Sequence, residues 1–209
     1  MNIRFYKKSA LGLSLFLMTA MSPVMASTIC YDFNNVEDVT TKWSPGYTQT
    51  LSDGSTMEIH YARTLDGQQI INEAQFAKIS ATGIAAGDAN EFHAYFANLQ
   101  LNLASPKSQV TMQFAQYGTS TGGYLYSTLA ANRERVQLEN GLESANGLVL
   151  GVNSDEQVKI STVVTEAPLP GEGGFHKGTL TFDALTSGGI NSLTLGGVQN
   201  YFDNICFSD

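Results

Sequence analysis

The only two cysteines of the chain could form a disulfide bond between its two ends. Cys30 lies near the start of the exported protein that we infer below, and Cys206 is the fourth residue from the end. In an oxidising compartment an isolated pair most simply forms a disulfide, and the alternative is two free thiols. Because the bonded Cα atoms must lie within about 7 Å, we expect the first and last strands to be adjacent.

Oxygen-bearing side chains beside these cysteines could bind a cation. If Cys30 and Cys206 pair on antiparallel strands, Asp32 comes opposite Asn204, and Asp203 lies next to that pair. Calcium prefers about 6–8 oxygen ligands of this kind. The pattern therefore predicts that Asp32, Asp203 and Asn204 contribute to a calcium site, with Ca²⁺ as the only cofactor. In the alternative interpretation Asp203 hydrogen-bonds a turn and Asp32 faces water.

Five aromatic residues are candidates for ligand binding. Trp43, the only tryptophan, and Tyr47 lie in a segment with the composition of a loop. Tyr124 and Tyr126 are two residues apart and share one face of a strand, and Tyr117 precedes the same loop. Amphipathic rings of this kind bind ligands that have both apolar and polar surface, as sugars do. The alternative is that each one is a core or rim residue.

A third group of residues could transfer protons. Glu58 and His60 share one face of a predicted strand, and Tyr61 and Arg63 follow. A base, a tyrosine and an arginine could carry out β-elimination on an acidic sugar, with the arginine neutralising the carboxylate. The acidic character of the chain opposes a polyanionic substrate, so we assign no catalytic residue.

Other active-site patterns are absent from the sequence. The three histidines are far apart and belong to no HExxH motif, and there is no CxxC pair to bind zinc. There is no Gly-x-Ser-x-Gly motif of a serine hydrolase. No pair of closely spaced glutamates suggests a glycosidase. We therefore favour a protein that is not an enzyme.

The elements that position these residues are predicted to be strands. Apolar and polar residues alternate in short runs, as in half-buried strands, and Gly, Asn and Asp residues separate the runs. The runs are Tyr31–Phe33, Met57–Tyr61, Leu99–Leu103, Val110–Phe114, Val158–Ile160, Leu180–Asp183 and Leu193–Leu195. We expect about ten to twelve short strands in an all-β antiparallel sandwich or jelly roll. Only residues 70–79 suggest helix, of one or two turns.

The first 26 residues have the pattern of a secretory signal peptide. A basic start is followed by an apolar run from Ala10 to Met21 and by small residues at Val24 and Ala26. The apolar run is shorter than the roughly 20 residues that cross a membrane. We expect cleavage before Ser27, one domain over residues 27–209, no membrane span, and a location outside the cell or in the periplasm.

Composition and charge narrow the class of partner. The full chain carries a net charge of -8, and loss of the signal peptide leaves 8 basic and 19 acidic side chains, a net of -11. Such a surface excludes nucleic acid as a partner, because nucleic-acid binding needs clustered Lys and Arg. It favours bound cations. An aromatic content of 10% is typical of a folded domain rather than a disordered chain.

The two ends of the chain resemble bacterial secreted jelly-roll domains. The residues that carry the resemblance are Cys30–Phe33, Gly178–Phe182, Gly189–Gly197 and Tyr201–Phe207. The last of these contains the aromatic-Asp-Asn-Ile run typical of the final strand of such domains. The resemblance implies a galactose-binding-like or concanavalin-like sandwich, a fold of carbohydrate-binding modules that often hold calcium beside their terminal strands. Glu58–His60 also resembles the Gln-Ile-His motif of alginate-lyase jelly rolls, but the other two lyase motifs are missing.

Three functions are therefore compared. The first is a non-catalytic module that binds extracellular polysaccharide, assisted by calcium. The second is a structural or adhesive protein of the cell surface or biofilm matrix, which would bind other surface proteins through an apolar patch or an unpaired edge strand. The third is a polysaccharide lyase, for which Glu58, His60 and Arg63 would have to meet in a cleft. Because fold alone does not determine function, the positions of these side chains must distinguish the three.

Overall fold

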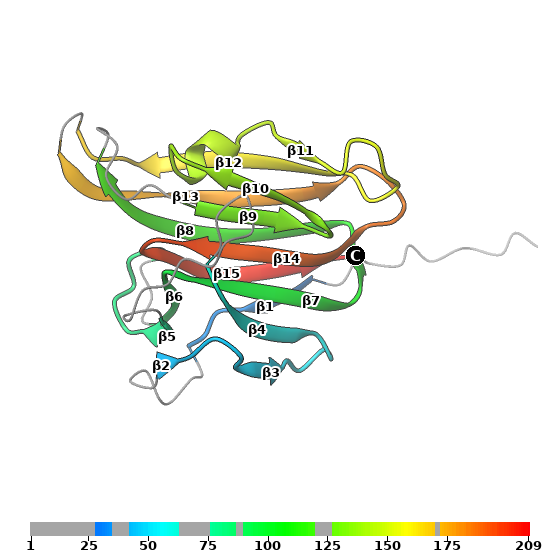
Figure 1. Ribbon diagram of the computed structural model, residues 1–209, viewed down its shortest axis with the longest axis horizontal. Helices are drawn as coiled ribbons and strands as arrows, with labels where there is room; N and C mark the ends of the chain where they lie inside the picture. The colour runs from blue at the N-terminus through cyan, green and yellow to red at the C-terminus, as the bar shows by residue number, and fades with distance from the viewer. Residues whose placement is uncertain (1–27, 35–41, 63–75, 87–89, 120–126, 170–171) are drawn as a thin grey trace, which may run out of the picture.

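Two antiparallel sheets form the whole of the described structure (Figure 1). The computed structural model describes residues 28–34, 42–62, 76–86, 90–119, 127–169 and 172–209. The predicted signal peptide lies outside these residues. Within them the fold is the predicted all-β sandwich, and the only helical element is a 3-10 turn, η1 (Leu142–Ala145). No helix among the described residues is long and apolar enough to cross a membrane.

The larger sheet has nine strands. Its order is β11-β12-β13-β8-β15-β6-β5-β2, and β1 pairs with β15. The strands are β1 (Thr28–Tyr31), β2 (Lys42–Trp43), β5 (Phe76–Ser80), β6 (Glu91–Tyr95), β8 (Gln109–Thr119), β11 (Val149–Leu150), β12 (Val158–Glu166), β13 (Gly173–Ala184) and β15 (Asn200–Ser208).

The smaller sheet has six strands, in the order β10-β9-β14-β7-β4-β3. They are β3 (Thr48–Thr50), β4 (Thr56–Tyr61), β7 (Ala97–Lys107), β9 (Ser127–Ala131), β10 (Glu134–Leu138) and β14 (Ile190–Gly197). The two sheets together have 15 strands, more than predicted, because several strands are only two or three residues long.

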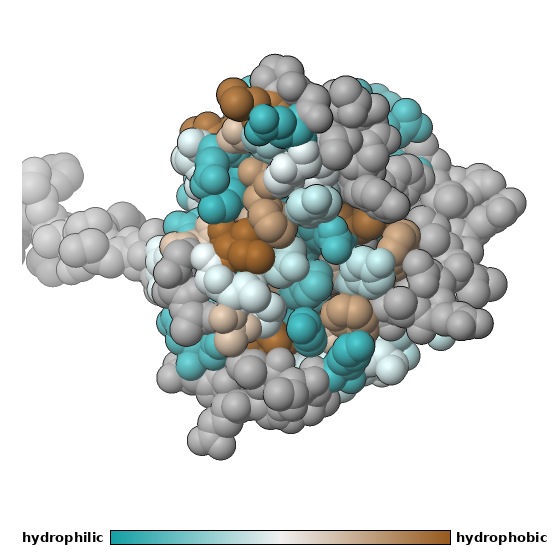
Figure 2. Space-filling model, turned by 90° about the vertical axis from the view of Figure 1, so that its left-hand side faces the viewer, coloured by the Kyte–Doolittle hydropathy of each residue, from teal (hydrophilic) through white to brown (hydrophobic). Residues whose placement is uncertain are grey.

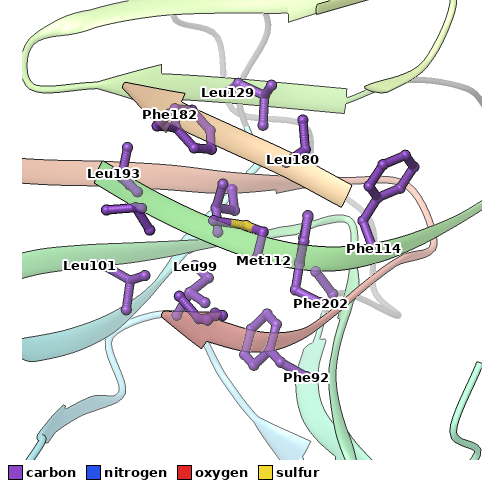
Figure 3. Packing of buried hydrophobic residues seen from close by; sticks show 14 of the residues in the cluster. Phe92, Leu99, Leu101, Met112, Phe114, Leu129, Leu180, Phe182, Leu193 and Phe202 are labelled. Carbon is purple, nitrogen blue, oxygen red and sulfur yellow. The ribbon is translucent and has the colours of Figure 1, made fainter. Parts of the chain in front are cut away.

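Alternate residues of both sheets point inward and form one apolar core (Figure 3). Phe114, Phe182 and Phe202 come from the larger sheet, and Leu99 and Leu193 come from the smaller one. All five side chains are buried. The period-two pattern thus selects the core-facing side of each strand, and the remaining positions form the two outer faces, where ligands can bind.

The terminal strands are adjacent, as the cysteine pair predicts. Cys30 and Cys206 face each other in the β1–β15 pairing and form a disulfide. β15 therefore pairs with β6 over its first part and with β1 over its last part, and β8 lies along its other edge. A bulge between Asp203 and Cys206, with Asn204 at a φ of 48°, separates the two parts.

One local prediction was wrong in part. The segment 70–79 was expected to form helical turns, but Phe76–Ser80 is strand β5. Its burial alternates as in a strand because it pairs with β6, and that tertiary pairing outweighs local propensity. The remainder of that segment lies outside the described residues.

Candidate functional site

A hollow opens at the edge of the sandwich where β1 and β2 of the larger sheet approach β3 and β4 of the smaller one. Its volume is about 390 Å³. We call it the edge hollow, and its lining residues are Cys30, Tyr31, Asp32, Phe33, Trp43, Gln49, Leu51, Ser52 and Met57. Its walls combine aromatic and aliphatic side chains with polar ones in about equal measure, a composition that can contact both the apolar and the polar surface of a small molecule.

Trp43 forms one wall of the edge hollow and is fixed by ring stacking. Its indole stacks on Tyr47 with ring centres 4.9 Å apart and an angle of 1° between the planes. On its inner side it contacts Phe92 of the core, and only 9% of its surface is exposed. The Tyr47 hydroxyl lies 3.3 Å from the side-chain oxygen of Gln49, to which it donates a hydrogen bond. The two aromatics predicted in this loop therefore act as one rigid unit beside the hollow.

A hydrogen-bond network holds Tyr31, another lining residue of the edge hollow, in position. The Tyr31 hydroxyl donates to a carboxylate oxygen of Asp53 at 2.8 Å, and Asp53 also accepts hydrogen bonds from the backbone N–H and the hydroxyl of Ser55. Burial and the Asp53 hydrogen bond raise the pKa of Tyr31. Burial acts to raise the pKa of Asp53, but its three hydrogen bonds outweigh that effect and lower the pKa. The network ties the first strand to the β3–β4 turn.

Tyr117 lies elsewhere, in β8 of the larger sheet. Figure 2 shows one end of the sandwich, where hydrophobic and hydrophilic residues are interspersed on the surface. Tyr117 lines a hollow of about 270 Å³ together with Tyr95, Val198 and Gln199. Trp43 and Tyr117 therefore belong to separate hollows, and the structure does not bring these two predicted aromatics together. Tyr124 and Tyr126 lie outside the described residues.

A buried histidine next to Tyr117 could not be identified from the sequence. His93 of β6 stacks on Tyr201 of β15 with ring centres 4.1 Å apart, and Phe76 and Tyr95 pack against its sides. Among the described residues, no hydrogen-bond partner reaches either of its ring nitrogens. Burial, helped by the nearby Lys78, lowers its pKa to about 4. His93 is thus neutral at physiological pH and forms part of an aromatic layer on the outer face of the larger sheet.

Of the predicted calcium ligands, Asp203 and Asn204 lie on β15, whereas Asp32 is the first residue after β1. A carboxylate oxygen of Asp203 accepts a hydrogen bond from the backbone N–H of Asn204 at 2.7 Å, and Asp32 accepts one from the backbone N–H of Asn34 at 3.1 Å. Both carboxylates thus bond to nearby backbone in turns. No group of three or more His, Cys, Asp and Glu side chains among the described residues could hold a metal ion. Calcium binding stays a prediction.

Glu58 and His60, two members of the proposed proton-transfer group, are in contact. Glu58 and His60 lie on the outer face of β4 with 3.2 Å between a carboxylate oxygen and the ring nitrogen. Asn102 of β7 donates a hydrogen bond to the other carboxylate oxygen at 3.1 Å. Arg63, the third member of that group, lies outside the described residues.

Comparison with known proteins adds little to this geometry. No family model matches the sequence, and no curated protein matches it. Among solved structures, the K2 cleaved adhesin domain of Lys-gingipain is similar over 87% of this chain and 97% of that domain, with 11% sequence identity and a TM-score of 0.40. A function for this chain has to be argued from its own side chains.

Proposed function

We propose that the protein is a non-catalytic, exported module that binds extracellular polysaccharide in the edge hollow. The observation that carries this proposal is that the only tryptophan lines a hollow of about 390 Å³ together with Tyr31, Asp32, Gln49 and Ser52. A sugar presents apolar C–H faces and polar hydroxyl edges. An aromatic wall and a few polar side chains match both kinds of surface.

The polar side chains of the hollow suit hydroxyl groups. A carboxylate such as Asp32 accepts hydrogen bonds, whereas the amide of Gln49 and the hydroxyl of Ser52 both donate and accept. A hydroxyl group needs partners of both kinds. The stacked Trp43–Tyr47 pair is already ordered, so binding would require little further ordering of these side chains.

Export of the chain supports an extracellular ligand. The signal-peptide pattern of the first 26 residues and the disulfide between the terminal strands both fit an oxidising compartment. A location of the exported protein in the periplasm or in the medium is part of the same proposal.

Trp43 provides a direct test, because all tryptophan fluorescence comes from one wall of the hollow. A glycan array of the mature protein identifies the ligands, and each ligand is then titrated while the fluorescence is recorded. We expect saturable changes in intensity or wavelength. Gln49→Ala and Asp32→Asn should weaken the apparent affinity, whereas Thr50→Ala, on the next residue of β3 but outside the hollow, should not. Array binding that leaves the fluorescence unchanged would place the ligand elsewhere.

Calcium assistance is a separable part of the proposal. The disulfide register pairs Tyr31 with Ile205, and Asp32 is the first residue after β1. Backbone carbonyls would have to complete the coordination shell. Millimolar calcium should raise the melting temperature by several degrees relative to EDTA, and Asp203→Ala should lose that increase. Equal melting temperatures in calcium and in EDTA would remove the metal from the proposal and leave the glycan site intact.

An adhesive role is the second candidate, and an exposed strand edge favours it. On the side away from β13, Ile160 of β12 bonds the backbone of Gly147 and Leu148, and the N–H of Thr162 donates to the Asn146 side chain. Beyond Thr162, no described strand pairs with β12 on that side. Val163 of this edge is 63% exposed, and Val164 and Leu169 are exposed as well. Such an edge can pair with a strand of another protein. Sedimentation at increasing protein concentration should detect self-association. Val163→Lys should abolish this self-association, whereas the control variant Val152→Lys, on an exposed loop, should retain it.

A further inference from the structure

The hollow that Tyr95 and Tyr117 line lies where the chain passes between the two sheets, and we call it the end hollow. Its volume is about 270 Å³, and Val198 and Gln199 complete its described lining. β6 of the larger sheet leads into β7 of the smaller one through Phe96 alone, and β14 leads back into β15 through Val198 and Gln199. None of the lining residues belongs to the edge hollow, so the two hollows are separate surfaces.

Further aromatic rings hold both tyrosines of the end hollow in place. Tyr95 stacks on Phe76 with ring centres 5.4 Å apart, and it meets Phe96 edge-on at 4.8 Å. Tyr117 meets Phe175 edge-on at 5.3 Å. A ligand would therefore contact rings that are already ordered, so binding would cost little side-chain entropy.

The backbone at the two sheet crossings is fixed as well. Phe96 and Gln199 both adopt the left-handed conformation, with φ angles of 50° and 52°. Their carbonyl groups accept hydrogen bonds from the backbone N–H groups of Ala62 and Tyr117, at 3.3 and 3.2 Å. This conformation is uncommon outside glycine and persists only where the surrounding structure holds it. The crossings thus keep Tyr95, Tyr117 and Gln199 at defined positions around the hollow.

Three polar groups of the end hollow are available to a ligand. They are the hydroxyl groups of Tyr95 and Tyr117 and the side-chain amide of Gln199, and none of them forms a hydrogen bond within the described ranges of the chain. Each of these groups can both donate and accept. No charged side chain belongs to the described lining. The hollow therefore combines apolar rings with neutral groups that can form hydrogen bonds.

We propose that the end hollow binds one neutral sugar residue of an extracellular polysaccharide, as a second sugar site of the module. The apolar C–H face of the sugar packs against the tyrosine rings, and its hydroxyl groups form hydrogen bonds with Tyr95, Tyr117 and Gln199. The choice of a polysaccharide rests on the function proposed above, but the site itself does not depend on the edge hollow.

The pattern of donors and acceptors selects a neutral sugar over two other ligands. An anionic sugar finds no cation in the described lining, and the net charge of -8 opposes it. A proline-rich peptide offers apolar rings, as sugars do, but the carbonyl groups of its prolines only accept hydrogen bonds. A sugar hydroxyl donates and accepts, so it uses both capacities of the phenol and amide groups.

The test is an NMR titration of the mature protein in which the tyrosine rings and the tryptophan side chain are observed together. The probes are four neutral sugars (glucose, galactose, mannose and N-acetylglucosamine), glucuronate as an anionic sugar, and a proline-rich peptide. We expect at least one neutral sugar to shift the signals of Tyr95 and Tyr117 saturably, and glucuronate and the peptide to bind more weakly. Trp43 reports the edge hollow in the same spectra, so each hollow is measured separately.

Two variants test the hydroxyl and amide groups. Tyr117→Phe keeps the ring and should weaken binding of the preferred neutral sugar by about threefold to tenfold, as expected for the loss of one hydrogen bond. Tyr61→Phe is the matched control, because Tyr61 is 42% exposed and lies outside the end hollow. Gln199→Asn introduces a residue type that tolerates a φ of 52° and should also weaken binding. Melting curves confirm that the variants are folded.

Four results would overturn the proposal. They are the absence of any shift of Tyr95 and Tyr117 with the neutral sugars, tighter binding of glucuronate or of the peptide, wild-type affinity in Tyr117→Phe, and equal losses in Tyr117→Phe and Tyr61→Phe. Shifts of Trp43 alone would retain the edge hollow as the sugar site and remove the end hollow. Shifts of the two tyrosines alone would do the reverse, so failure of either proposal is distinguishable.

Discussion

Acidification should destabilise the fold through one residue, His93. The folded protein holds this side chain neutral, with a pKa lowered from 6.5 to about 4, whereas the unfolded chain leaves it near 6.5. A lowered folded-state pKa adds stability above the unfolded pKa, and this contribution is lost as pH falls from about 6.5 towards 4. At 1.36 kcal/mol for each unit, the full effect is about 3.4 kcal/mol, of which about 2 kcal/mol is lost by pH 5.

The structure explains why the penalty cannot be avoided locally. Only 7% of His93 is exposed, and it stacks on Tyr201 at 4.1 Å. Protonation would place a charge among Phe76, Tyr95 and Tyr201 without a hydrogen-bond acceptor on either ring nitrogen. The ammonium group of Lys78 disfavours that charge further. Unfolding is therefore the route by which this imidazole can bind its proton.

The perturbation is His93→Phe, and the assay is urea unfolding at pH 7 and pH 5. Phenylalanine is larger than histidine, so the variant differs from the wild type in absolute stability, but that difference does not depend on pH. The free energy of unfolding that is lost between pH 7 and pH 5 should be about 2 kcal/mol smaller in the variant than in the wild type. This difference corresponds to roughly 4–8 °C in melting temperature. Tyr95→Phe keeps the imidazole and serves as the control. Equal losses in the wild type and His93→Phe would refute the reasoning, as would an imidazole NMR titration with a midpoint near 6.5.

Three further outcomes are expected from other parts of the fold. Tyr31→Phe should cost about 1–2 kcal/mol in urea unfolding at pH 7 because it removes a hydrogen bond to a carboxylate, and the difference should shrink below about pH 4 as Asp53 becomes protonated. Gly178→Ala should lower the free energy of unfolding by about 1–3 kcal/mol, since a Cβ atom there would lie 2.1 Å from the carbonyl oxygen of Val163. A variant as stable as the wild type would contradict the close approach of β12 and β13 at this residue. Reduction of the Cys30–Cys206 disulfide should lower the free energy of unfolding by roughly 5 kcal/mol, because the bond closes a loop spanning 176 residues. An unchanged urea midpoint after reduction would argue against that bond.

Much of the fold could be predicted because its strands carry a local signal. In Val110–Phe114 and Leu180–Asp183 the alternation of apolar and polar residues identifies both the strand and its core-facing side. The cysteine pair gives one long-range contact, and that contact correctly places the terminal strands together. By contrast, the expected strand Tyr31–Phe33 ends at Tyr31, because Phe33 adopts a φ of 57° in the turn that follows.

The candidate sites were harder to predict because they depend on contacts between distant segments. The sequence identifies Trp43 as an exceptional residue, but nothing local indicates that Tyr31 and Met57 complete a hollow with it. The burial of Asn98 has no signature in the sequence either, since Asn98 is one of many polar residues at outward positions. In the fold it lies against Gly196, which is on a strand far along the chain.

The two histidines on strands illustrate the limit of a pattern-based argument. His60 and His93 both point away from the core, each from the middle part of a strand on an outer face of the sandwich. His60 stays exposed and contacts Glu58, two residues away, so the sequence could predict that pair. His93 is buried by Tyr201, which the β6–β15 pairing brings beside it. Alternation reveals which residues share a face, but whether that face is covered depends on strands that join later. For the same reason, the local sequence does not distinguish His93, the residue from which we expect the strongest pH response.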